Sequence, residues 1–242
     1  MIEIKNIGIK FGGLQALDDV SFSVGEGEVV GLIGPNGAVK TTMMNIICGL
    51  YKPTAGSIHF EGTQITGLTS NKICHLGISR TYQIPQPFYA MTALGGVSAS
   101  VLNGKKRPNM CLSDAGLEAS YYLEFVGLFA KRDELASNLN LYELRMLELA
   151  RALATTPKLL LLDEVMAGLN PVESNRALDM IWSAQDQFGI TLLWIEHVMK
   201  IIMNAAQRIV VLQYGKKIAE GPPAEIVKDP RIIEAYLGGK RR

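Results

Sequence analysis

The sequence has few cysteines, no long hydrophobic run and almost no net charge. Its three cysteines, Cys48, Cys74 and Cys111, are odd in number and lack the paired spacing of a zinc site or a redox motif. We therefore expect a reducing compartment and no disulfide framework. No apolar stretch reaches the roughly 20 residues that a membrane helix needs, and the opening MIEIKNIGIK lacks the apolar core of a signal peptide. These absences predict a soluble, cytoplasmic chain that would reach a membrane only through a partner.

The charge balance gives no argument for nucleic acid as a partner. The chain carries 24 basic and 23 acidic residues, for a net charge of +1. The basic cluster at the end, Lys240 to Arg242, is typical of a solvated terminus. The sequence shows no internal repeat and no low-complexity segment. A hydrophobic content of 48% is enough to bury the core of one large domain, and we expect a single domain over residues 1–242.

The N-terminal part predicts strands followed by a glycine loop and a helix. Two alternating hydrophobic runs predict half-buried strands, and they comprise Ile2, Ile4, Ile7 and Ile9, and then Val20, Phe22 and Val24. The turn-rich FGGLQALDD between them predicts a loop. A continuous apolar run from Val29 to Ile33 predicts a buried strand, and a helix should run from Thr41 to Cys48 and end at Gly49.

The middle of the chain predicts an inserted, mostly helical subdomain. From about Thr69 to Asn138 the pattern indicates short helical pieces, with a Gly/Ser/Lys/Pro stretch around GGVSASVLNGKKRPN and a more clearly indicated helix from Ser113 to Val126. Asn140 and Glu143 have the spacing of a capping box, which predicts a helix from Leu141 to Thr155. We place this subdomain at approximately residues 84–156.

The last third alternates strands and helices. Leu159 to Leu162 is apolar on both faces, as in a central parallel strand. The sequence Asn170, Pro171 and Glu173 starts a helix that Gly189 ends. Buried strands are predicted at Ile190–Ile195 and Ile209–Leu212. This alternation predicts an α/β fold with a largely parallel sheet.

The loop GPNGAVKTT has the pattern of a phosphate-binding loop with one departure. It comprises Gly34, Pro35, Asn36, Gly37, Ala38, Val39, Lys40, Thr41 and Thr42. In such a loop the backbone N–H groups cradle phosphate oxygens, the lysine reaches the β and γ phosphates, and the first Thr hydroxyl takes Mg²⁺. Val39 stands where the pattern has glycine. The alternative is a plain turn, since Pro-Asn-Gly is common turn chemistry.

Polar residues also follow two buried strands. Asp163 and Glu164 end the run LLLLDE at the edge where α/β folds bind ligands. An Asp there can hold Mg²⁺ and a Glu can activate water, although an acidic helix cap is the alternative. Taken alone, a histidine such as His197 is more often a packing or capping residue than a catalytic one, and Gln83 is an ordinary loop residue. Phe11 could stack on a base or fill the core, and composition favours the core.

Taken in order, the motifs resemble those of the ATP-binding subunits of ABC transporters. They are Phe11 before GG, GPNGAVKTT, RTYQ, LNLYELRMLELARAL, LLLLDE, AGLNP and IEH, and the resemblance runs from Ile2 to about Gly238. It implies a P-loop NTPase core with a mostly parallel sheet, an N-terminal antiparallel β subdomain and an inserted helical subdomain. AMTALGGV, DEVMAGLNPVE and the final YGKKIAEG…DPRIIEAYLG are most similar to the ATPase subunits of branched-chain amino acid importers.

The resemblance also implies roles for the residues. Phe11 would stack on adenine, and His197 would contact the γ-phosphate. Gln83 would sense Mg²⁺ and the coupling surface, Asp163 would bind Mg²⁺ and Glu164 would be the general base. Residues 167–170 would line a dimer seam, and a final group of residues, Asn140, Leu141, Tyr142 and Glu143, would approach the ATP bound to a second subunit.

The implied partners are a second ATPase subunit, transmembrane permease subunits on the cytoplasmic side of the membrane and, indirectly, a substrate-binding protein. The family's usual Leu-Ser-Gly-Gly-Gln is replaced here by residues 139–143, LNLYE. A β-branched residue at a position that needs positive φ costs roughly 1–3 kcal/mol. Val39 and the altered signature therefore predict slow or absent hydrolysis with residual nucleotide binding.

Three functional readings follow. The first is an ATPase subunit of a branched-chain amino acid importer. The second is an impaired nucleotide-binding partner with a regulatory or structural role. The third, a soluble ABC protein that acts on DNA or ribosomes, is disfavoured because the chain has neither a second cassette nor a long coiled coil.

Overall fold

The computed structural model describes residues 1–35, 37–104 and 110–237. The predicted loop residue Asn36, residues 105–109 of the Gly/Ser/Lys/Pro stretch and the basic tail therefore lie outside the described residues. The chain divides into two compact units, one formed by Met1–Ser70 with Thr191–Arg242 and the other by Asn71–Ile190. Each unit is described by itself below.

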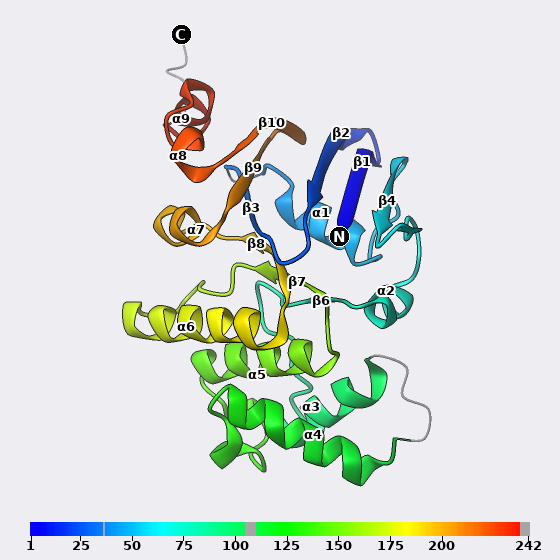
Figure 1. Cartoon of the computed structure of the whole chain (residues 1–242), viewed down its shortest axis with the longest axis vertical. Helices are drawn as coiled ribbons and strands as arrows, with labels where there is room; N and C mark the ends of the chain where they lie inside the picture. Colours follow the sequence, from blue (N-terminus) through cyan, green and yellow to red (C-terminus); the bar gives the residue numbers. More distant parts are fainter. Residues whose placement is uncertain (36, 105–109, 238–242) are drawn as a thin grey trace. The chain divides into compact units, whose positions relative to one another are not determined.

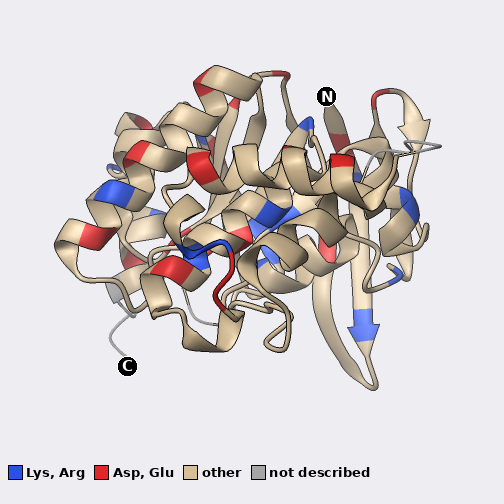
Figure 2. Cartoon of the chain, turned by 90° about the horizontal axis from the view of Figure 1, so that it is seen from below, with Lys and Arg blue, Asp and Glu red and all other residues tan. Residues whose placement is uncertain are grey.

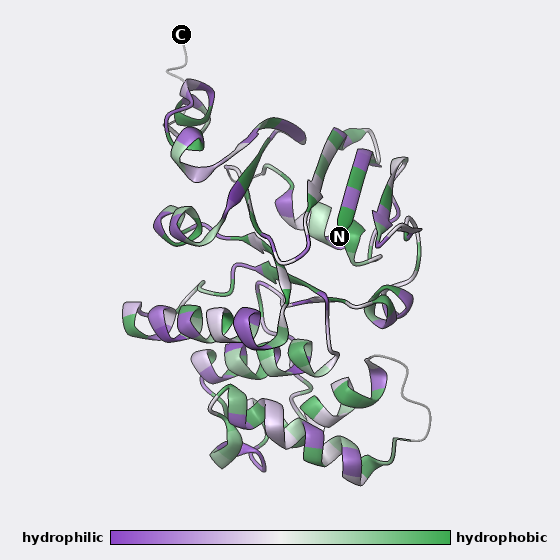
Figure 3. Ribbon diagram, in the orientation of Figure 1, coloured by the Kyte–Doolittle hydropathy of each residue, from purple (hydrophilic) through white to green (hydrophobic). Residues whose placement is uncertain are grey.

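The first unit contains an antiparallel sheet with the strand order β2-β1-β4-β5. Its strands are β1 (Ile2–Phe11), β2 (Leu14–Val24), β4 (Ala55–Phe60) and β5 (Thr63–Gln64). Hydrophobic and hydrophilic residues alternate along β1, as Figure 3 shows, so that Ile2 and Ile4 are buried while Glu3 and Lys5 are exposed.

The loop predicted over FGGLQALDD is wrong in its extent. Strand β2 already begins at Leu14, which pairs with Phe11, so the turn is confined to Gly12 and Gly13. Leu17 is completely buried in this sheet. Hydrogen bonding and burial along β1 therefore override the turn propensity of the Asp and Gly residues.

The first unit also contains parallel strands that lead into the phosphate loop. They are β3 (Val29–Ile33), β8 (Thr191–Ile195) and β9 (Arg208–Gln213), with β10 (Lys216–Gly221) antiparallel to β9. Strand β3 pairs in parallel with both β8 and β9. Every residue of β3 and β8 is buried, as expected for strands covered on both faces. The helices of this unit are α1 (Lys40–Ile47), α7 (Met199–Ala205), α8 (Pro223–Ile226) and α9 (Pro230–Leu237) (Figure 1).

The second unit is mostly helical and contains two parallel strands. Its elements are α2 (Ser70–Leu76), β6 (Ile78–Arg80), α3 (Ala93–Asn103), α4 (Leu112–Phe125), α5 (Leu141–Ala154), β7 (Leu159–Asp163) and α6 (Pro171–Phe188). Strand β6 pairs with β7 in parallel. Phe188 at the end of α6 packs against Tyr122 and Phe125 of α4, with ring centroids 6.0 and 5.2 Å away.

One local prediction for this unit is wrong. Strand β6 lies where only helical pieces were expected, because it pairs with β7 over just three residues and leaves no periodic pattern. Helix α3 agrees with the expected helical pieces and overlaps the Gly/Ser/Lys/Pro stretch. Thr92 caps this helix by accepting a hydrogen bond from the Gly95 N–H, and Ser98 donates to the Leu94 carbonyl. Capping and burial therefore outweigh the helix-breaking tendency of Gly95 and Gly96.

The predicted helix boundaries agree with the structure within one residue. Asn140 and Asn170 each form a complete capping box, with Glu143 and Glu173 respectively. Gly189 ends α6 in the left-handed conformation with φ 62°. Across the described part of the chain, no helix combines the length and the apolar character needed to span a membrane.

Candidate nucleotide-binding site

The phosphate loop connects β3 to the N-terminus of α1 in the first unit. Gly34 has φ 156°, and a Cβ atom there would lie 2.1 Å from the Leu212 carbonyl oxygen, so only glycine fits. Lys40 begins α1, and its ammonium donates to the Gly34 carbonyl at 2.8 Å. A Cβ on Gly37 would meet nothing within 4 Å. The loop thus combines an open backbone face, a nearly buried cation and the positive end of a helix dipole, which together suit phosphate.

Val39 occupies a left-handed backbone conformation, with φ 64° and ψ 27°. This confirms the expected positive φ at the position where the loop pattern has glycine. Val39 is the N-cap of α1, and its side chain makes no capping hydrogen bond. Its carbonyl accepts the first helical hydrogen bond, from the Met43 N–H at 3.2 Å. A β-branched residue is therefore held in glycine geometry at the start of the helix.

The structure places His197 just beyond the carboxyl end of β8. Because β3 and β8 are parallel neighbours, the phosphate loop and the Glu196–His197 pair leave the sheet from the same edge. Glu196 is buried, and one of its carboxylate oxygens accepts a hydrogen bond from the His197 N–H at 3.2 Å. His197 itself is exposed.

Phe11 is not a core residue. Its side chain is 44% exposed, and its ring meets Tyr51 edge to face with centroids 5.3 Å apart. The core role that composition favours for this residue is therefore wrong, because Phe11 is the last residue of β1 and lies beside the Gly12–Gly13 turn. Its exposed ring can take part in stacking.

Asp163 in the second unit has one carboxylate oxygen bound and the other unpaired. It is the last residue of β7 and is completely buried. Its Oδ2 accepts a hydrogen bond from Arg80 Nη2 at 2.5 Å, and its backbone N–H donates to Thr81 Oγ1 at 3.4 Å. Oδ1 is buried without a hydrogen-bond partner. An orphaned carboxylate oxygen in a dry site suits a hydrated Mg²⁺ ion, which usually takes only one or two protein carboxylates.

Across the described parts of the chain, no three His, Cys, Asp or Glu side chains gather to form a metal site by themselves. A magnesium ion here would therefore need ligands such as water and phosphate oxygens besides Asp163. That arrangement is usual where Mg²⁺ acts together with a nucleotide.

Gln83 and Glu164 are brought together in the second unit. The Gln83 side-chain amide donates to Glu164 Oε2 at 2.6 Å. Glu164 directly follows Asp163 and has φ 51°, an uncommon backbone conformation that turns the chain sharply at the end of β7. Two of the three side chains predicted to act in hydrolysis, Gln83 and Glu164, therefore share a hydrogen bond.

Sequence reasoning missed the arginine that holds these segments. Arg145, on α5, is 2% exposed and donates to the carbonyl oxygens of Tyr82, Gln83 and Ala167, at 2.8, 2.7 and 3.2 Å. Arginine on a helix is ordinarily a surface residue, so the sequence carries no signal for this role. Nearby, burial raises the pKa of Glu148 to about 7, although hydrogen bonding from the Tyr82 N–H opposes this shift.

The altered signature forms a well-capped but bulky helix start. The Asn140 side chain accepts from the Glu143 N–H at 2.9 Å, and Glu143 also pairs with Lys131 at 2.9 Å. The Leu141 side chain lies against Gly168, where an added Cβ would be 2.8 Å from Leu141 Cδ2. The capping prediction is confirmed.

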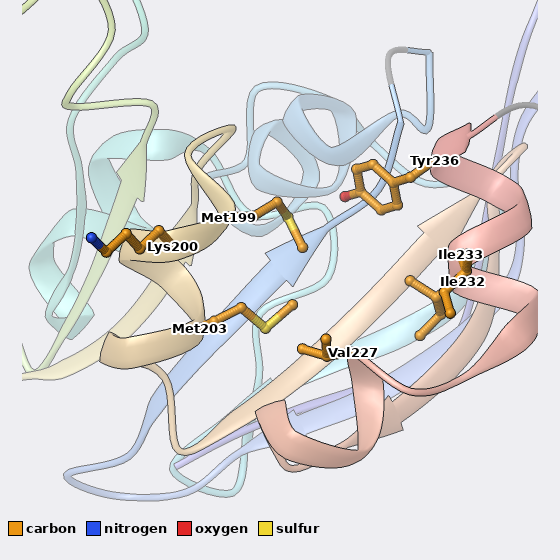
Figure 4. A pocket seen from close by; sticks show the side chains of 7 residues that line it. All are labelled: Met199, Lys200, Met203, Val227, Ile232, Ile233 and Tyr236. Carbon is orange, nitrogen blue, oxygen red and sulfur yellow. The ribbon is translucent and has the colours of Figure 1, made fainter.

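Sequence reasoning also missed a contact between the C-terminal helix and the phosphate loop. Burial raises the pKa of the Tyr236 phenol on α9, and the nearby Gly34 backbone opposes this shift. Figure 4 shows Tyr236 at the edge of a mainly apolar cavity of about 310 Å³, which is also lined by Met199, Met203 and Val227. The C-terminal helix therefore lies close to the start of the phosphate loop.

Comparisons with known proteins identify the family of this chain. The family described as "ABC transporter" matches residues 17–167, and "Branched-chain amino acid ATP-binding cassette transporter" matches residues 216–241. The chain is 37% identical to the high-affinity branched-chain amino acid transport ATP-binding protein LivG of Salmonella typhimurium, over 98% of both chains. It is 38% identical to the corresponding protein BraF of Pseudomonas aeruginosa, with the same coverage.

Solved structures show the same fold. The ADP conformation of MJ1267, an ATP-binding cassette of an ABC transporter, superposes with a TM-score of 0.87 at 32% identity, over 98% of both chains. The dimeric cassette MJ0796 gives a TM-score of 0.83 at 25% identity, over 92% of this chain and 99% of that one. The predicted P-loop NTPase fold class is confirmed. The chain therefore belongs to the ABC transporter family, in the group of the branched-chain amino acid transport ATP-binding proteins.

Proposed function

We propose that this chain binds and hydrolyses ATP in the presence of Mg²⁺ and thereby drives a membrane permease that imports branched-chain amino acids. The observation that carries the proposal is the phosphate loop, in which Lys40 and an open backbone face stand at the N-terminus of α1. The names of the LivG and BraF relatives support the substrate class.

In the first unit, backbone and side-chain groups of the phosphate loop and nearby residues would bind the nucleotide. Backbone N–H groups of the phosphate loop would cradle the phosphates, and Lys40 would exchange its contact with the Gly34 carbonyl for phosphate oxygens. Thr41 and Thr42 place hydroxyl groups in the first turn of α1. Phe11 would stack on the adenine, and His197 would contact the γ-phosphate.

In the second unit, the side chains would handle the metal and the water. Asp163 would hold Mg²⁺ through its unpaired oxygen, and Gln83 of the same unit would be a further ligand. When bound, Mg²⁺ neutralises charge on the transferred phosphoryl group. Glu164 would orient the attacking water and accept its proton, and Gln83 would hold that carboxylate through the hydrogen bond already present.

The partners we propose are a second ATPase subunit and the permease, which would hold the chain at the cytoplasmic face of the membrane. The MJ0796 cassette was solved as a dimer, which supports the first partner. The residues after Gln83 expose an apolar surface, with Ile84, Phe88 and Tyr89 at 69%, 49% and 55% exposure, which supports a protein contact there. A substrate-binding protein would select the amino acid outside the cell.

A second candidate function is an impaired nucleotide-binding half that needs a partner for activity. Val39 would weaken the site of this chain, whereas Leu141 and Tyr142 would weaken the site of the partner. The strained φ of Val39 and the bulk of Leu141 favour this candidate.

A role on DNA or ribosomes has less support. Within the part of the chain that the structure describes, Figure 2 shows acidic and basic residues interspersed along the elements. Membrane retention of the chain only when permease subunits are co-expressed would support the transport role over this one.

The test is ATP binding and steady-state hydrolysis by the purified chain with Mg²⁺, beside Val39→Gly and a Leu141→Gly/Tyr142→Gly double variant. Robust hydrolysis by the unaltered chain supports the transporter motor. Binding without turnover that the glycine variants restore supports the impaired half. No nucleotide binding by any of these proteins would contradict both candidates.

A further inference from the structure

We propose that Arg80 positions Asp163 for Mg²⁺ and connects this metal ligand to the segment that carries Gln83. The inference rests on the proposed function, because it assumes that Asp163 holds the metal. Arg80 is the last residue of β6, and its register partner on β7 is Leu161. Its side chain therefore reaches forward along the sheet edge to Asp163.

The ion pair between Arg80 and Asp163 is short and buried from solvent. Arg80 Nη2 lies 2.5 Å from Asp163 Oδ2, and the two side chains are 4% and 1% exposed. A buried carboxylate needs such a partner, because an uncompensated buried charge is strongly destabilising. Arg80 thus balances the charge that a metal ligand must carry.

The pair also determines which oxygen of Asp163 stays available for a metal ion. Arg80 occupies Oδ2, while Oδ1 has no hydrogen-bond partner. Groups that hydrogen-bond a metal ligand from behind set its orientation, and their loss typically weakens metal binding roughly 10- to 100-fold. Arg80 is such a group, because it hydrogen-bonds the carboxylate of Asp163.

Arg80 also contacts the chain segment that leads to Gln83. Its guanidinium carbon lies 4.9 Å from the centroid of the Tyr82 ring. Tyr82 is held in turn by Glu148, which accepts from its N–H at 3.0 Å, and by Arg145, which donates to its carbonyl. A displacement of the Gln83 segment would therefore alter the support of Asp163, so that metal affinity would respond to contacts on that segment.

The test compares Arg80→Gln, Arg80→Lys and Tyr82→Leu in the full chain. The control is Arg132→Gln, since Arg132 stacks on Phe129 in the same unit but is 39% exposed at its side chain. Binding of a fluorescent ATP analogue is titrated with Mg²⁺ to obtain the half-saturating metal concentration, and separately in EDTA to obtain metal-free affinity. Thermal melting of each variant is recorded in parallel.

We expect Arg80→Gln to raise the half-saturating Mg²⁺ concentration roughly 10- to 100-fold, with unchanged nucleotide affinity in EDTA and an unchanged control. Arg80→Lys should give a smaller shift, because it keeps the charge but loses the planar fork. If Arg80→Gln does not fold, the Mg²⁺ dependence of Arg80→Lys tests the inference. Tyr82→Leu should shift the metal dependence in the same direction, and its failure to do so would refute the connection to Gln83.

A lower melting temperature with unmoved metal dependence in the Arg80 variants would overturn the inference and leave Arg80 a structural residue. If the unaltered chain bound no nucleotide in either titration, the proposed function would fail together with the inference. Intact nucleotide binding with unmoved metal dependence would contradict the inference alone.

Discussion

Replacing Val39 tests the energetic cost of the strained phosphate loop. Valine has φ 64° at this position, in a region that β-branched residues rarely occupy. Such a conformation costs of order 1–3 kcal/mol. Because the fold itself holds this φ, we expect the cost to reduce the free energy of unfolding.

The magnitude follows from two opposing terms. Val39→Gly removes the strain but adds conformational freedom to the unfolded chain, worth roughly 0.5–1 kcal/mol. The net gain in unfolding free energy should therefore be about 0–2 kcal/mol. Val39→Asn should gain at least as much, because Asn tolerates this conformation and favours the N-cap position. Val39→Ala removes the branch but keeps Cβ, so it should recover only part of the strain.

The assay is chemical denaturation of the four proteins, with ATP affinity measured alongside. We expect the order Asn or Gly, then Ala, then Val in stability, and a change in ATP affinity of no more than roughly tenfold, which corresponds to about 1.4 kcal/mol. If Gly and Asn left stability at or below that of the valine protein, the reasoning from backbone strain would be refuted.

Three further predictions concern the second unit. Burial raises the pKa of Glu148 to about 7 from an unfolded value near 4.5, so the stability gained from its protonated form is present below the unfolded pKa and is lost as pH rises through the folded pKa. The unaltered protein should lose up to about 1.4 kcal/mol of unfolding free energy between about pH 6 and about pH 8, and Glu148→Gln should not show this loss. Equal pH profiles for the two proteins in denaturation would contradict this. Asn170→Ala removes two capping hydrogen bonds and should cost about 1 kcal/mol of stability, whereas Ser183→Ala on the same helix should change stability by less than about 0.5 kcal/mol. Glu164→Gln should keep ATP binding but lower turnover by roughly 100-fold or more, and near-normal turnover would exclude Glu164 as the general base.

The sequence predicts well those features that depend on neighbouring residues. The capping boxes at Asn140 and Asn170 need only a residue three positions away, and the buried strand from Val29 to Ile33 is visible as an unbroken apolar run. The positive φ of Val39 follows from the loop pattern alone. Local chemistry determines each of these features, so they can be recognised without the fold.

The remaining features depend on contacts between distant residues. Arg80 and Asp163 are separated by 83 positions, and each looks ordinary in its own segment. Strand β6 is three residues long and exists because β7 lies beside it. Helix α3 contains Gly95 and Gly96, so the sequence does not predict its bounds, which depend on the Thr92 cap and on packing. These features arise from contacts between segments that are far apart in the sequence.

Arg145 also has a consequence for how the second unit assembles. Its guanidinium gathers carbonyl oxygens from Tyr82 and Gln83, which lie 63 and 62 positions before it, and from Ala167, which lies 22 positions after it. These bonds form only when all three segments have come together, so we expect their formation to be cooperative. Native-state hydrogen exchange should then show amides beside Tyr82 and Ala167 opening together, as one unit, despite their distance in sequence.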